Sequence, residues 1–469
     1  MTFFSIKFFI FLSVVFIIYY LIPVRYRYLW LLVSSCIFYA SWSVKGMAVL
    51  GFITLVSYSS ARMMEKANKR LCLVAGIVIS LATLIAFKFL GSWTRGRYYF
   101  NVPVGLSFFV LEAVGYMIDV YSGKMKCEQN IGRYGLFLSF FPTVLSGPIE
   151  RSSNLLKQIQ EGREFSYEKA KRGLLLIIEG GYLKLLIANR LAMIVNAAFE
   201  NHYEQTGATM LIAIIFYGIQ LYADFAGYTC IALGVGHLFG FSLTENFRQP
   251  YFAGNIRSFW RRWHLSLSSW LRDYVYIPLG GNRKGKIRQY VNLLITFLIS
   301  GIWHGTGWQF MVWGALHGIY QVVSNASNPW RTKAFAKIKR ECFSYRLMQV
   351  IITFGLVDFA WLFFRAASVR EALLICRNIL FNFQIGNTIS NKLYLMGFDE
   401  SRFLVLLIEI FVFLFVDILH EKEISIRNLL DRQNKVFRWI IYLSMCMVLV
   451  IGSLYDYGVE ASTFIYTRF

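Results

Sequence analysis

The chain has few charged residues for its length. Asp, Glu, Lys and Arg make up 16% of its 469 residues, whereas hydrophobic residues make up 57%. So small a charged fraction cannot cover the surface of a soluble domain of this size, which excludes an ordinary soluble enzyme. There are only 7 prolines, and no stretch rich in Pro, Gly or Ser divides the chain. The sequence therefore predicts one domain over residues 1–469, with a motif-rich core at about 100–320 and a tail motif at 462–469.

Signals for metal and nucleotide sites are also missing. The 7 cysteines are scattered, with no paired spacing typical of a disulfide framework or a zinc site. Without an HExxH motif or a His/Cys cluster, a metal centre built from His304 and His317 with Asp224 or Asp358 is disfavoured. The segment 280–285, GGNRKG, lacks the GxxxxGK[ST] spacing and predicts a basic turn that could contact donor phosphates. We expect no metal and no tightly bound cofactor.

Long apolar runs are abundant instead. Runs that could cross a hydrocarbon core of about 30 Å occur from one end of the chain to the other, for example at 3–22, 71–90, 403–419 and 439–454. Backbone that faces lipid must satisfy its own hydrogen bonds, so these runs predict helices. The fold class expected is an all-α, multi-pass integral membrane protein with about ten to twelve transmembrane helices. The first run lacks a small-residue cleavage site and reads as a retained span.

The charge is strongly basic, with 48 Lys and Arg against 26 Asp and Glu. The basic residues cluster in short loops beside apolar runs, as orientation signals and lipid headgroup contacts do, so nucleic acid is a disfavoured partner. Arg25 and Arg27 predict that the N-terminus lies outside. The basic clusters at 62–70 and 124–133 then fall inside, and the alternation becomes ambiguous after residue 172.

Two of the four polar segments that interrupt the apolar pattern are informative. Residues 150–172 mix both charges after a Gly-Pro break, and we expect a solvated amphipathic helix there. Residues 248–288 hold nine Lys or Arg against one acid, Asp273, with aromatic and aliphatic residues interleaved throughout. This pattern predicts short helices at the interface or re-entrant segments, with arginine stems along apolar surface.

His304 is the first candidate catalytic residue. It lies in the apolar segment LLITFLISGIWHGTGWQF, where an ionisable ring is costly and usually functional. A neutral imidazole can take a proton from a hydroxyl, which predicts a general base. The neighbouring Gly301, Gly305 and Gly307 remove bulk where a substrate could approach. The alternative is a histidine that only forms hydrogen bonds between helices.

His264 is the second candidate. Hydroxyl groups and tryptophans surround it in the sequence: Ser266, Ser268 and Ser269, with Trp260, Trp263 and Trp270. Such a site could orient a thioester carbonyl or stabilise an oxyanion; the alternative is an interfacial anchor. The other histidines, His202, His237, His317 and His420, are expected to be structural.

Asp224 lies in a glycine-containing apolar segment, so its carboxylate must be hydrogen-bonded or paired with a cation. A structural bridge toward the basic segment 248–288 is favoured over a catalytic role.

Two motifs carry a resemblance to a known family. WRRWHLSLSSWLRDYVYIPLGGNRKG at 260–285 and NLLITFLISGIWHGTGWQFMVWGALHG at 292–318 resemble the bacterial alginate O-acetylation branch of the membrane-bound O-acyltransferases (MBOAT). The similarity extends to segments starting at Pro103, Leu138 and Tyr222. It implies a ring of tilted helices with a central funnel, in which His304 is catalytic and His264 is a second implicated residue. Donor or funnel lining is then expected from Arg261, Arg262, Trp263, Trp303 and Asp224.

The resemblance also implies partners. An acyl thioester, acetyl-CoA or an acyl carrier protein, would enter from the cytoplasm toward the basic segment. The acceptor side would involve a polysaccharide and a periplasmic or extracellular SGNH-hydrolase-like acetyltransferase, with the protein held among lipids of the cell inner (plasma) membrane. The tail STFIYTRF resembles a family motif whose tyrosine is proposed to relay the acyl group; the matching residue is Tyr466. Thr467 and Arg468 depart from that motif, and an aromatic terminus at the interface is the alternative.

The function expected is transfer of an acyl group, with acetyl favoured, to an extracytoplasmic polysaccharide. The alternative within the family is D-alanyl transfer from a carrier protein to teichoic acid. In that system the tyrosine motif tends to lie on a separate small protein, which favours the polysaccharide branch. From another class, a transporter or flippase would use Asp224, His264 and His304 to line a pathway, but no inverted repeat is visible. A structural scaffold for polysaccharide export is a further alternative.

Overall fold

The computed structural model describes residues 1–93, 102–334 and 342–455, and the described backbone is helical with no strand. The all-α prediction is therefore confirmed for this part of the chain. The helices fall into two compact units. Unit 1 comprises residues 1–179 and 228–245, and unit 2 comprises residues 180–227 together with the chain from residue 246 onward.

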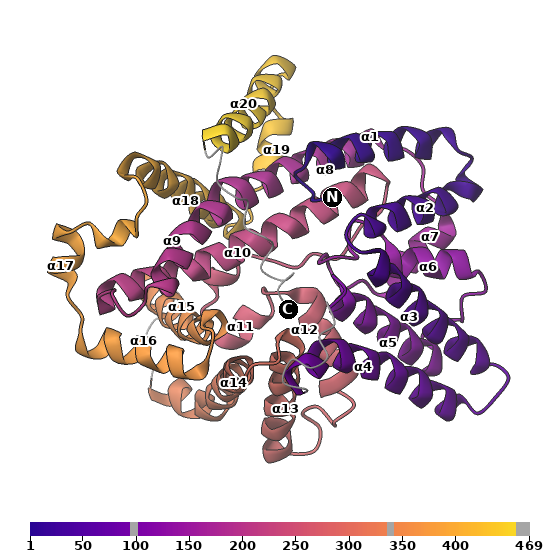
Figure 1. Ribbon diagram of the computed structural model, residues 1–469, viewed down its shortest axis with the longest axis horizontal. Coiled ribbons are helices and arrows are strands. Elements are labelled where there is room, and N and C mark those ends of the chain that lie inside the picture. Colours follow the sequence, from indigo (N-terminus) through magenta and orange to yellow (C-terminus); the bar gives the residue numbers. More distant parts are fainter. Residues whose placement is uncertain (94–101, 335–341, 456–469) are drawn as a thin grey trace. The chain divides into compact units, whose positions relative to one another are not determined.

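Unit 1 is built mainly from the N-terminal helices (Figure 1). Its elements are α1 (Ile6–Leu21), η1 (Val24–Tyr26), α2 (Arg27–Ala40), α3 (Val44–Met63), α4 (Lys69–Trp93), α5 (Leu106–Tyr121), α6 (Ile131–Ser139), η2 (Ser152–Leu156), α7 (Lys157–Glu161) and most of α8 (Tyr167–Gly181). The Tyr19 and Tyr20 hydroxyls donate to the carbonyls of Phe239 and Leu238, at 3.3 and 2.8 Å. The returning segment 228–245 therefore completes the unit.

The segment 150–172 differs from the single solvated helix that its composition predicts. It forms η2, α7 and the start of α8, and it belongs to unit 1, where its first residue is buried. Glu150 is buried, and its carboxylate accepts hydrogen bonds from the backbone N–H of Thr244 at 2.6 Å and from the Asn154 amide at 2.8 Å. A buried carboxylate needs such donors, because water cannot reach it. The solvated-helix prediction is wrong for this end of the segment.

Unit 2 contains the remaining elements. They are η3 (Tyr182–Ala188), α9 (Asn189–Glu200), the first part of α10 (Gly207–Leu238), η4 (Pro250–Phe252), α11 (Ile256–Trp260), α12 (Leu265–Leu271), η5 (Arg272–Tyr276), α13 (Lys286–His304), α14 (Trp308–Ala334), α15 (Phe343–Arg365), α16 (Val369–Phe381), α17 (Ile385–Ser390), η6 (Leu393–Leu395), α18 (Glu400–Glu421), α19 (Ile426–Asp431) and α20 (Lys435–Tyr455). The basic segment 248–288 thus folds into short helices, as predicted.

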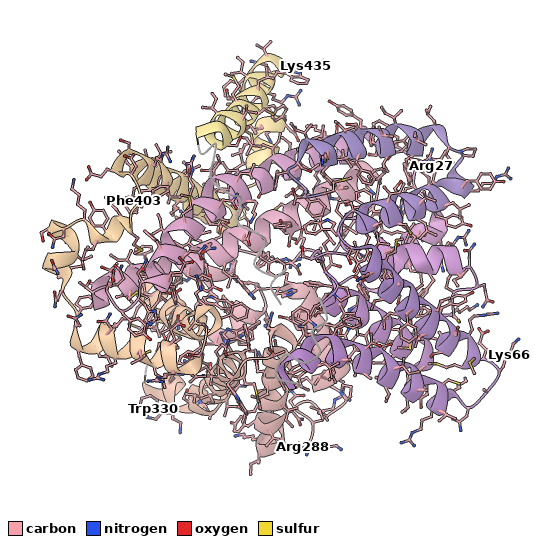
Figure 2. The ribbon with its side chains drawn as sticks, in the orientation of Figure 1. Arg27, Lys66, Arg288, Trp330, Phe403 and Lys435 are labelled. Carbon is pink, nitrogen blue, oxygen red and sulfur yellow. The ribbon has the colours of Figure 1, made fainter. Side chains whose placement is uncertain are left out.

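Six helices of the described chain are long and apolar enough to cross a membrane: α3, α4, α10, α15, α18 and α20. On α18 the exposed side chains include Ile408, Phe411 and Phe415, whereas Leu406 and Ile410 are buried. Exposed apolar side chains at helical spacing are stable against lipid but not against water. Figure 2 marks the beginnings of α18 and α20 by Phe403 and Lys435. The protein is therefore a multi-pass membrane protein, and the larger count of ten to twelve crossings stays a prediction.

Helices α13 and α14 pack side by side as a tight hairpin in unit 2 (Figure 1). A Cβ added at Gly301 would lie 2.3 Å from the Phe310 carbonyl oxygen, and one added at Gly314 would lie 2.4 Å from the Phe297 carbonyl oxygen. Small residues at these positions let the two backbones touch. The space beside Gly305 is likewise filled, by the ring of Phe310. The room that the glycines were expected to leave for a substrate is occupied by α14.

Candidate active site

His304 is the last residue of α13 and is 2% exposed. Its ring lies in an aromatic cluster within unit 2, with centroid distances of 4.7 Å to Trp303, 5.0 Å to Trp313 and 5.2 Å to Phe364. Trp313 meets the imidazole edge to face. The cluster joins α13, α14 and α15, so three helices fix the position of this imidazole.

His264 lies directly before α12, and its backbone is left-handed, with φ 45° and ψ 55°. This conformation is uncommon for a side chain with a Cβ, although histidine is among the residues that tolerate it best. The buried Asn246 holds the next residues: its carbonyl accepts from the Leu265 N–H at 3.0 Å, and its Oδ1 accepts from the Ser266 N–H at 3.1 Å. Asn246 thus positions the histidine, a role that no local sequence motif signals.

The two candidate histidines share a neighbour. The ring of Trp303 lies 6.2 Å from the His264 ring and 4.7 Å from the His304 ring, centroid to centroid. The ring of Phe225 also contacts His264, with a centroid distance of 4.6 Å. Burial among these rings lowers the pKa of His264, which lies outside the six candidate spans, to about 3. Desolvation disfavours the charged imidazolium, so His264 is neutral at physiological pH.

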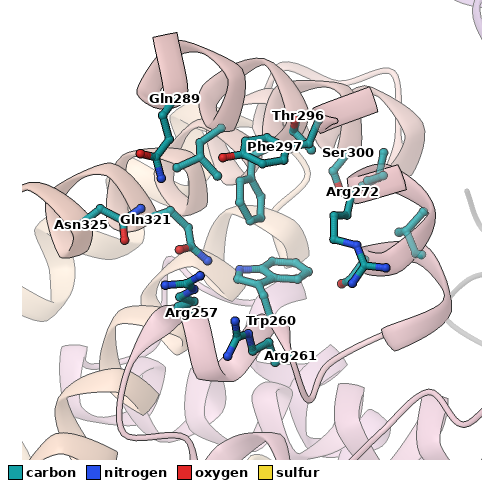
Figure 3. A pocket seen from close by; sticks show the side chains of 15 residues that line it. Arg257, Trp260, Arg261, Arg272, Gln289, Thr296, Phe297, Ser300, Gln321 and Asn325 are labelled. Atoms are coloured by element: carbon teal, nitrogen blue, oxygen red, sulfur yellow. The ribbon is translucent and has the colours of Figure 1, made fainter. Parts of the chain in front are cut away.

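A cavity of about 240 Å³ opens in the same unit, beside these elements (Figure 3). It is lined by Arg257, Trp260, Arg261, Leu267, Ser268, Leu271, Arg272, Tyr276, Gln289, Leu293, Thr296, Phe297, Ser300, Gln321 and Asn325. The lining contains three arginines and no acidic residue, and Figure 3 shows Arg257 and Arg261 beside the Trp260 indole. Arg272 also pairs with Asp273 at 2.7 Å. An anionic ligand with an apolar arm suits such a lining.

The structure separates the two arginines of the WRRWH motif. Arg261 lines the cavity, whereas Arg262 forms a bidentate ion pair with Glu421 at the end of α18, at 2.6 and 3.1 Å. Trp263 is 1% exposed and packs in an aromatic core, 5.0 Å from the ring of Trp361. A direct contact of Arg262, Trp263 or Trp303 with the acyl donor stays a prediction.

Asp224 has a partner that was not predicted from the sequence. Its carboxylate lies 2.6 Å from the ammonium of Lys184, and both side chains are almost completely buried. Lys184 belongs to η3, so this ion pair differs from the predicted bridge between Asp224 and the basic segment 248–288. The predicted relay residue Tyr466 falls outside the described residues. Among the residues that the structure does describe, no three His, Cys, Asp or Glu side chains form a group that could hold a metal ion.

Comparison with known proteins connects this site to a family. The sequence pattern of MBOAT, the membrane-bound O-acyltransferase family, matches residues 129–369, which include both histidines and the cavity lining. The "Probable alginate O-acetylase AlgI" of Pseudomonas putida is 36% identical over 388 residues, covering 78% of this chain and 77% of the relative.

Two other relatives have different acceptors in their names. The "Peptidoglycan O-acetyltransferase" of Helicobacter pylori is 29% identical and covers 94% of this chain and 91% of its own. The "Teichoic acid D-alanyltransferase" of Bacillus subtilis is 29% identical but covers 56% of this chain and 68% of its own. The extent of the family match and the identity to the alginate O-acetylases lead to one conclusion: this chain belongs to the membrane-bound O-acyltransferase family and is an acyltransferase that uses an acyl thioester donor.

Proposed function

We propose that the protein moves an acetyl group from a cytoplasmic thioester across the inner (plasma) membrane for O-acetylation of an extracytoplasmic polysaccharide. The observation that carries the proposal is the position of His304 at the end of α13, where side chains of α13, α14 and α15 surround its ring. Gln289, Thr296 and Ser300 of the same helix line the arginine-rich cavity. One helix thus carries the base and part of the wall of an anion-binding cavity, which suits a donor with a phosphate at one end and a thioester at the other.

In this proposal His304 is the general base. In its neutral form the imidazole accepts the proton of the attacking hydroxyl. The oxygen of that hydroxyl forms a bond to the thioester carbonyl carbon, the carbon–sulfur bond breaks, and the proton passes to the departing thiolate. His264 assists from the other side of Trp303, where a neutral ring N–H can donate to the carbonyl oxygen as charge develops.

The cavity arginines bind the donor. Arg257 and Arg261 present guanidinium groups to a lining without acid, and guanidinium groups bind phosphate in a bidentate manner. Coenzyme A and the phosphopantetheine of an acyl carrier protein both offer a phosphate, so the donor is one of these two. Lipid headgroups remain outside this assignment, because the cavity is also lined by amide and hydroxyl side chains suited to an amide-bearing arm.

The acceptor is an extracytoplasmic glycan. A relative at 36% identity over 78% of the chain carries alginate O-acetylation in its name, and one at 29% identity over 94% of the chain carries peptidoglycan O-acetylation. The D-alanyltransferase covers less of the chain, which favours acetyl over D-alanyl. We propose that a periplasmic SGNH-hydrolase-like acetyltransferase completes transfer to the polysaccharide, and that Tyr466 relays the acyl group to it.

The test is the ester-linked acetate on purified cell-surface polysaccharide. Cells would express the wild-type protein, His304→Ala, the control His202→Ala, or no protein, at matched membrane levels. His202 is a half-buried histidine in the turn after α9, with Nδ1 2.9 Å from the Phe199 carbonyl oxygen. Loss of acetate in the null cells and in His304→Ala alone supports the proposal. Full acetate with His304→Ala would contradict the role of His304 as general base. Unchanged acetate in cells without the protein would contradict O-acetylation, and D-alanine esters and then transport would be measured instead.

A further inference from the structure

Ser300 has a buried hydroxyl group that makes no hydrogen bond within the described structure. Its side chain is 1% exposed and lines the arginine-rich cavity on α13 (Figure 3). The hydroxyl oxygen is fully buried and has no hydrogen-bond partner in the described structure. Buried polar groups are normally paired, because leaving one unpaired is costly, so each exception in a fold calls for an explanation.

Several other buried hydroxyls on the described helices are paired with their own backbone, whereas Ser139 at the end of α6 and Ser152 at the start of η2 are unpaired like Ser300 but do not line the cavity. Ser57, Ser80 and Thr296 each donate to the carbonyl oxygen four residues earlier, at 2.6, 2.8 and 2.7 Å. This bond is the usual solution for serine and threonine within an apolar helix. Thr296 lies one turn before Ser300 on the same helix and makes it. The Ser300 hydroxyl does not make this bond.

The spacing along α13 relates Ser300 to the catalytic histidine. Ser300 and His304 are four residues apart, so they lie on the same face of the helix, about 6 Å apart along its axis. The cavity thus extends from its arginines to a position one turn before His304. A thioester whose arm occupies the cavity would bring its carbonyl between the Ser300 hydroxyl and the His304 imidazole.

We propose that the Ser300 hydroxyl donates a hydrogen bond to the carbonyl oxygen of the acyl thioester, and so is a substrate-binding residue of the acyl transfer. The inference rests on the proposed function, since it requires a thioester in this cavity. Ser300 forms no covalent bond in the step: the acceptor oxygen bonds to the carbonyl carbon, the thiolate leaves, and the proton passes through His304. The hydrogen bond orients the carbonyl and becomes stronger as negative charge develops on its oxygen.

The test is a binding comparison with two probes on the purified full-length protein. The probes are S-acetyl-4′-phosphopantetheine and 4′-phosphopantetheine with a free thiol, the arm common to coenzyme A and acyl carrier proteins. Ser300→Ala is expected to weaken binding of the acetylated probe about tenfold and to leave binding of the thiol probe unchanged, because only the first has the carbonyl. Wild-type affinity of Ser300→Ala for the acetylated probe, or equal losses for both probes, would overturn the proposal.

Ser80→Ala is the matched control. Ser80 is a buried serine of α4 in unit 1 whose hydroxyl is already donated to Gly76. Its variant is expected to lose a little thermal stability and no affinity for either probe. Ser300→Ala is expected to keep or raise the thermal stability, because it removes an unpaired buried hydroxyl. A marked loss of stability in Ser300→Ala would point to a structural role and overturn the assignment.

The binding assay contains no acceptor, so its result is separate from that of the acetate measurement. If Ser300→Ala loses affinity selectively while His304→Ala still acetylates polysaccharide, the Ser300 contact holds and the general base is wrong. If the wild-type protein binds neither probe, both the Ser300 contact and the donor assignment are wrong.

Discussion

The indole Nε1 of Trp260 donates a hydrogen bond to Nδ1 of His317 at 3.2 Å. Because Nδ1 accepts this bond, the proton of the neutral imidazole is on Nε2. His317 is fully buried, and Trp260 lines the arginine-rich cavity. His317 was expected to be structural. Its hydrogen bond to Trp260 gives it a specific structural role, because the bond orients an indole that lines the cavity.

His317→Phe is therefore expected to keep the ring packing but to leave the Trp260 N–H without its acceptor. The loss is about 1–3 kcal/mol of stability if the indole stays buried, with a weaker effect if it rotates. Thermal unfolding of the purified protein and the KM for the thioester would be measured together. His317→Gln, which retains an acceptor, is the control; equal behaviour of the two variants would contradict the positioning role.

The two adjacent arginines of the WRRWH motif should behave differently. Arg261→Gln removes a cavity charge and is expected to raise the donor KM about tenfold, as loss of one charge-assisted hydrogen bond to phosphate does. Arg262→Gln breaks a partly exposed pair with Glu421 and is expected to cost under about 1 kcal/mol of stability with little change in KM. The wild-type KM should rise with ionic strength, less steeply in Arg261→Gln. The reverse ranking of the two variants would refute this division of roles.

The buried pair of Lys184 and Asp224 predicts a strong single-variant effect. Lys184→Met leaves the Asp224 carboxylate without this counter-ion and is expected to cost about 3–5 kcal/mol of stability. The double variant Lys184→Met, Asp224→Leu is expected to recover most of that loss, because neither charge of the pair is then left without its partner. Thermal stability and protein level in membranes provide the measurement. A double variant as unstable as the single one would mean that the pair has a further function.

His264 predicts a pH dependence of stability. Its folded pKa is about 3, and the unfolded value is about 6.5. The unfolded chain therefore binds more protons between these values, so the contribution of His264 is complete above pH 6.5 and is lost as the pH falls toward 3. The slope contributed is up to about 1.4 kcal/mol per pH unit. His264→Asn keeps a residue that tolerates the left-handed backbone and should flatten the slope between pH 6.5 and 5. An unchanged slope would show that other groups dominate.

The helices were predictable because long apolar runs have few alternatives in lipid. The predicted runs at 71–90, 403–419 and 439–454 lie within α4, α18 and α20. The short helices of 248–288 also followed from composition, since interleaved arginines and aromatics cannot form one long apolar helix. Both depend on local sequence alone.

The partners of buried polar groups were not predictable, because they join residues distant in the chain. Lys184 pairs with Asp224 from another element, and Asn246 holds the start of α12 from twenty residues away. Glycine roles were ambiguous for the same reason: the sequence cannot distinguish space for a substrate from space for Phe310. The catalytic roles of His304 and His264 stay predictions that the experiments above address.

The hydrogen bond between Tyr19 and the Phe239 carbonyl closes unit 1 across 220 residues. At synthesis rates of about 5–20 residues per second, about 10–45 s pass between the synthesis of α1 and that of the segment around Phe239. During that interval the tyrosine hydroxyls must find other acceptors, such as lipid headgroups or an insertion factor. Chains that end before residue 238 should therefore be recognised and degraded, even when every N-terminal helix is intact.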